Sequence, residues 1–160
     1  MTAFEIPPPG TRGTSLRGAP IWHLVMGLFA GLYRLLGGRL IGRRLLLLET
    51  IGARSGRQRT AMLFRFTEGD GRWLVIGSNA GAARHPAWFI NLARNPDQFS
   101  VQVGRERVKV RPELLAGAER TEAWQRILAA APGYGRYGRY EGQTDREIPI
   151  VRLNRLVSQA

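Results

Sequence analysis

Residues 50–60 have the composition of an anion-binding turn. The stretch lies between two apolar runs and combines two glycines, three arginines and hydroxyl side chains. Glycine lets backbone N–H groups approach a ligand closely, and the planar arginine fork matches the oxygen atoms of a phosphate or a carboxylate. The stretch has neither the Gly-Lys-Ser/Thr ending of a Walker loop nor the three spaced glycines of a dinucleotide fingerprint. Two interpretations therefore stay open, an anion site and an exposed basic hairpin turn. The candidate binding residues are Arg54, Ser55, Arg57 and Arg59.

Two further polar clusters follow along the chain. Ser78-Asn79-Ala80-Gly81-Ala82 comes directly after an expected strand, and its small residues would let the backbone approach a ring or a phosphate. A plain loop of small residues would have the same composition. Trp88 and Asn91 are three residues apart on the next expected helix, so the indole and the amide share a face. The tryptophan would equally suit a hydrophobic core.

A third cluster is aromatic. Tyr134, Tyr137 and Tyr140 are spaced three residues apart in a segment rich in glycine and arginine. We expect these tyrosines to lie outside the core, because the glycines remove the neighbours that a core residue needs. Such a segment could form a lid over an aromatic or apolar substrate, and a tyrosine hydroxyl there could hydrogen-bond a developing negative charge or relay a proton.

Composition limits the classes of protein that can carry these clusters. With 160 residues, 44% of them hydrophobic and 22% charged, the chain is long enough for one globular domain. Basic residues exceed acidic ones by 24 to 12, a net charge of +12, which favours an anionic partner: a polyanionic ligand, an acidic lipid surface or nucleic acid. The arginines are dispersed and no nucleic-acid-binding motif is present, so we predict no nucleic-acid partner. With no cysteine and only two histidines, the chain is not expected to hold a metal.

The first 44 residues divide into two segments. Residues 1–17 are rich in proline, glycine and threonine and predict a flexible arm. Residues 18–44 predict an apolar, amphipathic helix followed by several arginines, which suits attachment to an anionic membrane surface. Packing of this helix on the domain or on a partner chain is the equal alternative, and its polar interruptions disfavour a full membrane span. A signal peptide fits poorly, so we expect a cytoplasmic protein with peripheral attachment to the inner face of the cell membrane.

The remainder predicts an α+β fold with about six mainly antiparallel strands. The expected strands are 45–51, 59–66, 73–78, 99–103, 106–110 and 148–153. Residues 68–71 and 104–105 are expected hairpin connections, and Pro149 places the last strand at an edge or a strand start. Helices are expected from Pro86 to before Asn95 and from about Gly117 to Ala131. Antiparallel hairpins with helices to one side suggest a small β-barrel.

Taken in order, these motifs resemble the deazaflavin-dependent nitroreductase family. The resemblance rests on residues 50–59 (TIGARSGRQR), 77–81 (GSNAG), 85–96 (HPAWFINLARNP), 134–140 and 144–150 (TDREIPI). It covers about residues 45–153. It implies that residues 45–157 form a split β-barrel domain that binds the deazaflavin coenzyme F420, whose tail carries a phosphate and a chain of glutamates. An extended polyanion of this kind would account for the arginine-rich turn.

The resemblance also implies roles for individual residues. Arg54 and Arg59 would meet the anionic tail, with Arg57 as a helper. The residues expected beside the ring system or the phosphate are Met62, Leu63, Ser78, Asn79, Ala80, Gly81, Trp88 and Asn91. Ala53 and Asn79 depart from the family pattern, which has basic residues there, so phosphate binding would be weaker or would shift towards Arg57 and Arg84. His85 would either reach an anion at the helix N-terminus or cap the helix.

The implied activity is hydride transfer from reduced deazaflavin to a planar, electron-poor acceptor: a quinone, a nitroaromatic compound or an activated alkene. The acceptor would lie beneath Tyr134, Tyr137 and Tyr140. FMN is the alternative cofactor, because split barrels also serve FMN and haem proteins. A non-catalytic cofactor carrier or membrane adaptor is a further alternative, and a homodimer is compatible with the resemblance.

Overall fold

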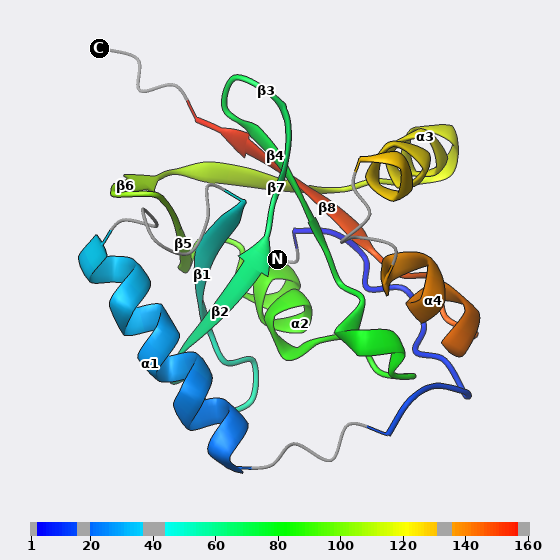
Figure 1. Cartoon of the computed structure of the whole chain (residues 1–160), viewed down its shortest axis with the longest axis horizontal. Coiled ribbons are helices and arrows are strands. Elements are labelled where there is room, and N and C mark those ends of the chain that lie inside the picture. Colours follow the sequence, from blue (N-terminus) through cyan, green and yellow to red (C-terminus); the bar gives the residue numbers. More distant parts are fainter. Residues whose placement is uncertain (1–2, 16–19, 37–43, 131–135, 157–160) are drawn as a thin grey trace.

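The computed structural model describes residues 3–15, 20–36, 44–130 and 136–156 (Figure 1). The elements of the first half are α1 (Pro20–Leu36), β1 (Leu45–Ile51), β2 (Gln58–Phe64), β3 (Phe66–Gly69), β4 (Arg72–Ile76) and the short 3-10 helix η1 (Asn79–Gly81). The second half adds α2 (Ala87–Arg94), β5 (Phe99–Val103), β6 (Glu106–Val108), β7 (Val110–Leu114), α3 (Gly117–Ala129), α4 (Arg136–Gln143) and β8 (Ile150–Arg155).

Two four-stranded antiparallel sheets form the framework. The first sheet has the order β2-β1-β5-β6 and the second has the order β3-β4-β8-β7. The expected α+β class with antiparallel strands is confirmed, but the described residues form eight strands rather than about six. Two expected strands are each divided between the sheets, at Arg65 and at Lys109. The alternation of apolar and polar residues continues through both breaks, which is why the sequence pattern did not reveal them.

The main core lies between the two sheets. Leu46 and Leu48 of β1 face Val75 of β4 and Leu153 of β8 within one buried cluster. Helix α2 contributes Phe89, together with Trp88 and Leu92, to the same cluster. Helix α2 is therefore fixed by the core beside β1 and β2, where its other side chains can reach the turn between these strands.

A second cluster lies between the second sheet and α3. Trp124 of this helix is buried there, and Tyr137 of α4 packs beside it with ring centroids 6.5 Å apart. Tyr137 also lies 6.2 Å from Phe66 and 6.1 Å from Tyr140, measured between ring centroids. The expectation that the tyrosines avoid the core is wrong for Tyr137 and Tyr140, because residues 136–143 form a helix that puts both rings on one face. Tyr134 lies outside the described residues.

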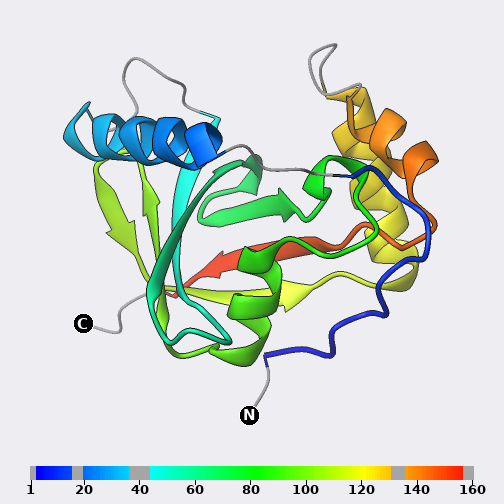
Figure 2. The ribbon, with the colours of Figure 1, turned by 90° about the horizontal axis from the view of Figure 1, so that it is seen from below.

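Helix α1 lies across the outer face of the first sheet (Figure 2). Tyr33 is buried there, donates a hydrogen bond to the carbonyl of Leu45 and accepts one from the N–H of Gly104. The structure therefore shows the helix packed on the domain, with Leu28 and Leu35 of its other face 75% and 79% exposed. Within the described ranges, no helix is both long and apolar enough to span a bilayer.

The N-terminal residues 3–15 run along the side of the domain near α2 and η1 (Figure 2). The ring of Phe4 stacks on Phe89 with centroids 5.2 Å apart. Further along, the carboxylate of Asp145 accepts hydrogen bonds from the Thr11 hydroxyl and from the N–H of Arg12, and these bonds lower the pKa of Asp145 to about 2. Residues 3–15 thus contact the domain through long-range hydrogen bonds, which proline and glycine content cannot indicate; the flexibility of this arm stays a prediction.

Candidate functional site

The arginine-rich turn between β1 and β2 is closed by its own backbone. The N–H of Gly52 donates to the carbonyl of Arg57, and the N–H of Gly56 donates to the carbonyl of Gly52, both at 2.8 Å. A Cβ on Gly52 would lie 2.5 Å from the Ser55 hydroxyl oxygen, and Gly56 has φ = +63°. The turn therefore requires glycine at position 56, whereas a Cβ at position 52 would displace the Ser55 hydroxyl; the side chains between them project outward.

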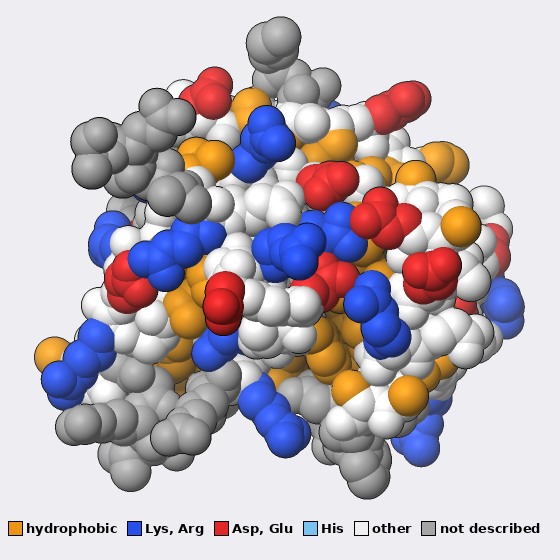
Figure 3. Space-filling model, turned by 90° about the horizontal axis from the view of Figure 1, so that it is seen from above, with side chains coloured by type: hydrophobic (Ala, Val, Ile, Leu, Met, Phe, Trp, Pro, Cys, Tyr) orange, Lys and Arg blue, Asp and Glu red, His pale blue; other side chains and the backbone are white. Residues whose placement is uncertain are grey.

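The three arginines of this turn are available to an external anion. Arg54, Arg57 and Arg59 are exposed, and none of them forms an ion pair with another described residue. Some arginines elsewhere are compensated by neighbouring carboxylates: Arg152, for example, binds those of Glu68 and Glu119 at 2.6 Å each. Figure 3 shows a face on which acidic and basic side chains lie side by side. The turn is thus a local concentration of uncompensated positive charge.

Helix α2 holds the turn in place from behind. The side-chain oxygen of Asn91 accepts from the N–H of Ala53 at 2.9 Å, and its amide nitrogen donates to the Thr50 hydroxyl at 3.2 Å. Asn95 donates from its amide nitrogen to the carbonyl of Ile51 at 3.0 Å. The amide of Asn91 is thus already engaged by the turn, so Asn91 positions the arginines.

Met62 and Leu63 of β2, which were expected beside the ring system of the cofactor, lie on opposite faces of the first sheet. Leu63 packs against the core cluster that contains Trp88, whereas Met62 packs under α1 with Tyr33. Successive strand residues point to opposite faces, so only one of the pair can share a face with Arg59. The structure brings Arg59, Leu63 and Trp88 to the inner side of the sheet and places the side chain of Met62 on the outer side.

In the loop that contains η1, every backbone carbonyl from Gly77 to Arg84 accepts a hydrogen bond. The side chain of Arg146 donates to the carbonyls of Gly77, Ser78 and Ala82 at 3.0, 2.7 and 2.8 Å. Thr14 binds two further carbonyls: its hydroxyl donates to that of Ala80 and its N–H donates to that of Gly81. The three remaining carbonyls, of Asn79, Ala83 and Arg84, accept from Ala82 N, Gly10 N and the Asn79 side-chain amide.

The same loop has an unusual backbone conformation. Asn79 and Ala80 have φ values of 46° and 49°, and they are the two non-glycine residues with positive φ in the described part of the chain. Left-handed conformations cost about 1–2 kcal/mol per residue, less for asparagine, and persist where the surroundings over-determine them. The N–H groups of Ser78, Asn79 and Ala80 have no acceptor among the described residues. Successive free N–H groups in such a turn form a concavity that binds anions.

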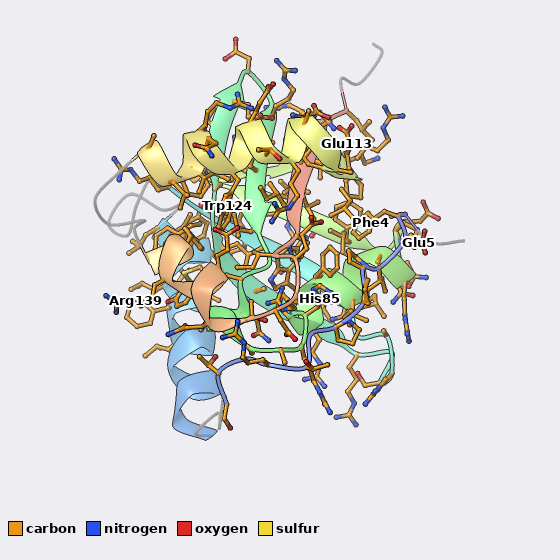
Figure 4. The ribbon with its side chains drawn as sticks, turned by 90° about the vertical axis from the view of Figure 1, so that its right-hand side faces the viewer. Phe4, Glu5, His85, Glu113, Trp124 and Arg139 are labelled. Carbon is orange, nitrogen blue, oxygen red and sulfur yellow. The ribbon has the colours of Figure 1, made fainter. Side chains whose placement is uncertain are left out.

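His85 has a structural role that differs from both of its expected roles. Its Nε2 lies 3.0 Å from the carbonyl of Pro7 and its Nδ1 lies 3.4 Å from a guanidinium nitrogen of Arg146. Because Arg146 can only donate, Nδ1 is the acceptor and Nε2 carries the proton. Burial, and secondarily the charge of Arg146, lower the pKa of His85. The imidazole neither caps α2 nor reaches an external anion, and Figure 4 shows it beside the N-terminal segment with Phe4.

The end of α4 lies directly against η1. Gly81 has φ = +77°, and a Cβ there would lie 2.8 Å from the side-chain oxygen of Gln143 and 3.3 Å from the carbonyl of Tyr140. That oxygen of Gln143 is buried and has no hydrogen-bond partner among the described residues. Gly81 therefore provides room for a close approach, and Gln143 offers an unused polar atom beside the loop. No role was assigned from the sequence to Gln143, nor to Arg146 although it lies within the TDREIPI segment, because each acts through contacts remote in the chain.

A cavity of about 400 Å³ lies away from these residues, between the second sheet and α3. Its lining includes Arg65, Phe66, Thr67, Leu74, Arg126 and Ile127. It contains none of the predicted site residues, although Phe66 in its wall contacts Tyr137.

These features define a class of protein. Two elements whose chemistry suits anions, the arginine turn and the η1 loop, lie at the ends of strands in an α+β fold, and no cluster of metal ligands occurs within the described residues. That combination is suited to a cofactor with an extended anionic tail.

Comparison with known proteins gives the family. The sequence profile of the F420H(2)-dependent quinone reductase family matches residues 29–155, so the chain belongs to this family of F420-dependent oxidoreductases. An F420H(2)-dependent quinone reductase of Mycobacterium tuberculosis (strain ATCC 25618 / H37Rv) is 34% identical over 139 residues, 82% of this chain and 90% of that protein. The expected deazaflavin-dependent family and its cofactor F420 are confirmed.

Two solved structures are similar to the whole domain. An F420-H2 dependent reductase, FDR-A, is 34% identical, with a TM-score of 0.58 over 70% of this chain and 95% of that chain. A second structure, a domain-swapped dimer, is 29% identical, with a TM-score of 0.60 over 84% of this chain and 99% of that chain. The split-barrel class expected from the sequence is confirmed by these neighbours together with the two antiparallel sheets.

Proposed function

We propose that this protein transfers a hydride from reduced F420 to a quinone. Membership of the F420H(2)-dependent quinone reductase family supports the reaction class. The observation that carries the proposal is a pair of elements suited to anions. They are the three exposed arginines of the β1–β2 turn, which form no ion pair with a described residue, and the three N–H groups of the η1 loop, which have no acceptor there. When bound, F420 supplies the hydride from its deazaflavin ring, so the residues of this chain need only bind, orient and exclude water.

The tail and the ring of the cofactor would be held by different residues. The glutamate chain would be bound by Arg54, Arg57 and Arg59, because guanidinium groups match carboxylates in geometry and charge. Since these arginines are exposed, the affinity for the tail should fall as the salt concentration rises. The N–H groups of residues 78–80 would bind the phosphate. Leu63 and Trp88, on the inner side of the first sheet, would provide apolar contacts for the ring.

The acceptor would lie on the side of α4. Tyr137 and Tyr140 are half-buried and form an aromatic row with Phe66, which suits stacking with a planar, electron-poor molecule. A tyrosine hydroxyl there could stabilise the negative charge that develops on a quinone oxygen and deliver a proton. We propose quinones as the acceptors, with nitroaromatics and activated alkenes as further members of the same planar class.

A fluorescence titration tests the cofactor, and a panel of acceptors tests the reaction. Quenching of F420 fluorescence should saturate with the purified protein, and FMN added in its place should not bind. Oxidation of F420H2 should then be faster with a menaquinone analogue than with a nitroaromatic compound. Tight FMN binding without F420 binding would reject the cofactor assignment, and F420 binding without turnover of any acceptor would indicate a carrier protein.

We also propose that α1 attaches the protein peripherally to a membrane surface, where apolar quinones are found. Leu28, Phe29, Leu32 and Leu35 are exposed on a helix whose other face is buried against the first sheet. Arg34 does not support attachment by charge, because it binds Glu49 and the Thr60 hydroxyl. Sedimentation with lipid vesicles should therefore depend on apolar contact: replacing both Leu28 and Leu35 by glutamate should abolish it while F420 binding is unchanged.

Self-association is a separate proposal. One structural relative is described as a domain-swapped dimer, so we propose that this chain also forms a homodimer. Light scattering during gel filtration, with the protein diluted over a wide range, measures the mass directly. A constant monomer mass would reject the proposal.

A further inference from the structure

Arg146 is a buried cation without a carboxylate partner. Its side chain is 6% exposed, and no aspartate or glutamate oxygen among the described residues lies within ion-pair distance of it. The equally buried Arg152, at 9% exposure, binds two carboxylates at 2.6 Å. Burial lowers the pKa of Arg146, but an arginine stays protonated in a protein. The charge of Arg146 therefore lacks a counter-charge in the part of the chain that the structure describes.

The donors of Arg146 are all directed to neutral groups around the η1 loop. Nε donates to the carbonyl of Ala82, and one terminal nitrogen donates to those of Gly77 and Ser78. The other terminal nitrogen contacts Nδ1 of His85 at 3.4 Å and the carbonyl of Glu147 at 3.5 Å. A guanidinium has five N–H groups, so these five contacts account for every donor. None is left to bind a ligand directly.

These bonds decide which way the amide groups of the loop point. In a planar trans peptide the carbonyl and the following N–H point in opposite directions, and the described part of the chain has no cis peptide. The carbonyls of Gly77 and Ser78 point at Arg146, so the N–H groups of Ser78 and Asn79 point away from it. Arg146 thus holds two free donors outward and places a positive charge behind them.

We propose that Arg146 is a positioning residue for the phosphate of the cofactor: it sets the direction of the N–H groups in the η1 loop, and the bound phosphate becomes its missing counter-charge. This inference rests on the proposed function, because it assigns the phosphate to the η1 loop. Thr14 supports the same loop from the outer side through the carbonyls of Ala80 and Gly81, without adding charge. Variants of Thr14 and Arg146 therefore distinguish two effects on phosphate binding: the orientation of the loop's peptide groups, which both residues influence, and the positive charge, which only Arg146 supplies.

The test compares two ligands, F420 and the deazaflavin nucleoside that lacks the phosphate and the glutamates. Dissociation constants come from fluorescence quenching at low and high salt, with Arg146→Lys, Arg146→Gln and Thr14→Val as the variants. Arg152→Lys is the matched control, because this buried arginine contacts carboxylates elsewhere in the domain. Thermal melting with and without inorganic phosphate provides a readout that does not require the cofactor.

A charge-assisted hydrogen-bond network of this size predicts a large and selective effect. F420 should bind about 10- to 100-fold more weakly to Arg146→Gln, less so to Arg146→Lys, and about 3-fold more weakly to Thr14→Val. The nucleoside should bind every variant within about 2-fold of the parent, and stabilisation by phosphate should be lost only in the Arg146 variants.

Three results would contradict this role. Equal losses for F420 and the nucleoside would mean that Arg146 shapes the ring site. An unchanged dissociation constant for F420 in Arg146→Lys and Thr14→Val would remove the positioning role, even if Arg146→Gln failed to fold. A loss of the same size in Arg152→Lys would mean that any buried arginine matters equally. If the parent binds neither ligand, the proposed function fails first.

Discussion

Asn91 is predicted to control both the stability of the fold and the affinity for F420. The side chain is 6% exposed and makes two hydrogen bonds, to the N–H of Ala53 at 2.9 Å and to the hydroxyl of Thr50 at 3.2 Å. Asn91→Ala removes both bonds, each worth about 1 kcal/mol, and leaves the buried Thr50 hydroxyl unsatisfied at a further cost of roughly 1–2 kcal/mol. The free energy of unfolding should therefore fall by about 3–4 kcal/mol.

For a domain of this size, that loss corresponds to a fall of about 5–15 °C in the melting temperature. The arginines of the turn would also lose their preorganised position, so F420 should bind about 10-fold more weakly under conditions where the variant is folded. Urea denaturation monitored by tryptophan fluorescence measures the first effect, and quenching of F420 fluorescence measures the second.

A double-mutant cycle separates the bond to Thr50 from other consequences of the substitution. Thr50→Val, combined with Asn91→Ala, should give a coupling free energy of about 1 kcal/mol. Asn95→Ala is a milder control, since Asn95 is half-buried and donates one bond, to the carbonyl of Ile51. A melting temperature for Asn91→Ala within about 2 °C of the parent, together with an unchanged Kd for F420, would refute the anchoring role.

Three other predictions concern the same region. Replacing Arg54 and Arg59 by glutamine should weaken F420 binding about 10-fold at low salt and make the remaining affinity less dependent on salt, because only Arg57 of the three is kept. Titrations at two ionic strengths measure both effects, and a parent-like salt dependence would remove the tail assignment. The pKa of His85 is lower in the folded protein than in the unfolded chain, so the folded protein binds fewer protons at this residue. The contribution of neutral His85 to stability is therefore present above the unfolded pKa near 6.5 and is lost as the pH falls through the lower folded pKa. His85→Gln should therefore flatten the decrease in melting temperature below about pH 6.5, and an identical pH profile in the variant would contradict the assignment. Gly81→Ala should weaken F420 binding and lower the melting temperature, because φ = +77° and the Gln143 oxygen only 2.8 Å away oppose a Cβ; a fully parent-like Gly81→Ala would show that the loop tolerates the left-handed side chain.

The local elements were predictable where their signals lie within a few residues. The expected strand 45–51 matches β1, the turn at residues 68–71 joins β3 to β4, and Pro86 immediately precedes α2. Pro149 indeed lies just before a strand, β8, although that strand is in the interior of its sheet. Apolar periodicity and turn residues determine such features through nearest neighbours, so they can be read without knowledge of the fold.

The sheet assignments were not predictable in the same way. The alternating pattern across residues 59–66 fits one strand, yet Arg65 separates β2 in the first sheet from β3 in the second. The N–H of Arg65 instead donates to the carbonyl of Arg44, and its side chain donates to the carbonyl of Leu45. A corner between two sheets depends on partners outside the local segment, and alternation is the same on either side of it.

By itself, the sequence determined which residues could bind an anionic cofactor and which family pattern they follow. The exposed arginines and glycines of residues 52–59 were recognisable because their chemistry is local to one turn. Only the tertiary structure decided how that chemistry is oriented. Asn91 uses its amide to hold the turn, and Arg146 holds the carbonyls of a loop more than 60 residues earlier in the chain. The direction of a peptide amide depends on which distant group binds its carbonyl, and that information is absent from any short segment.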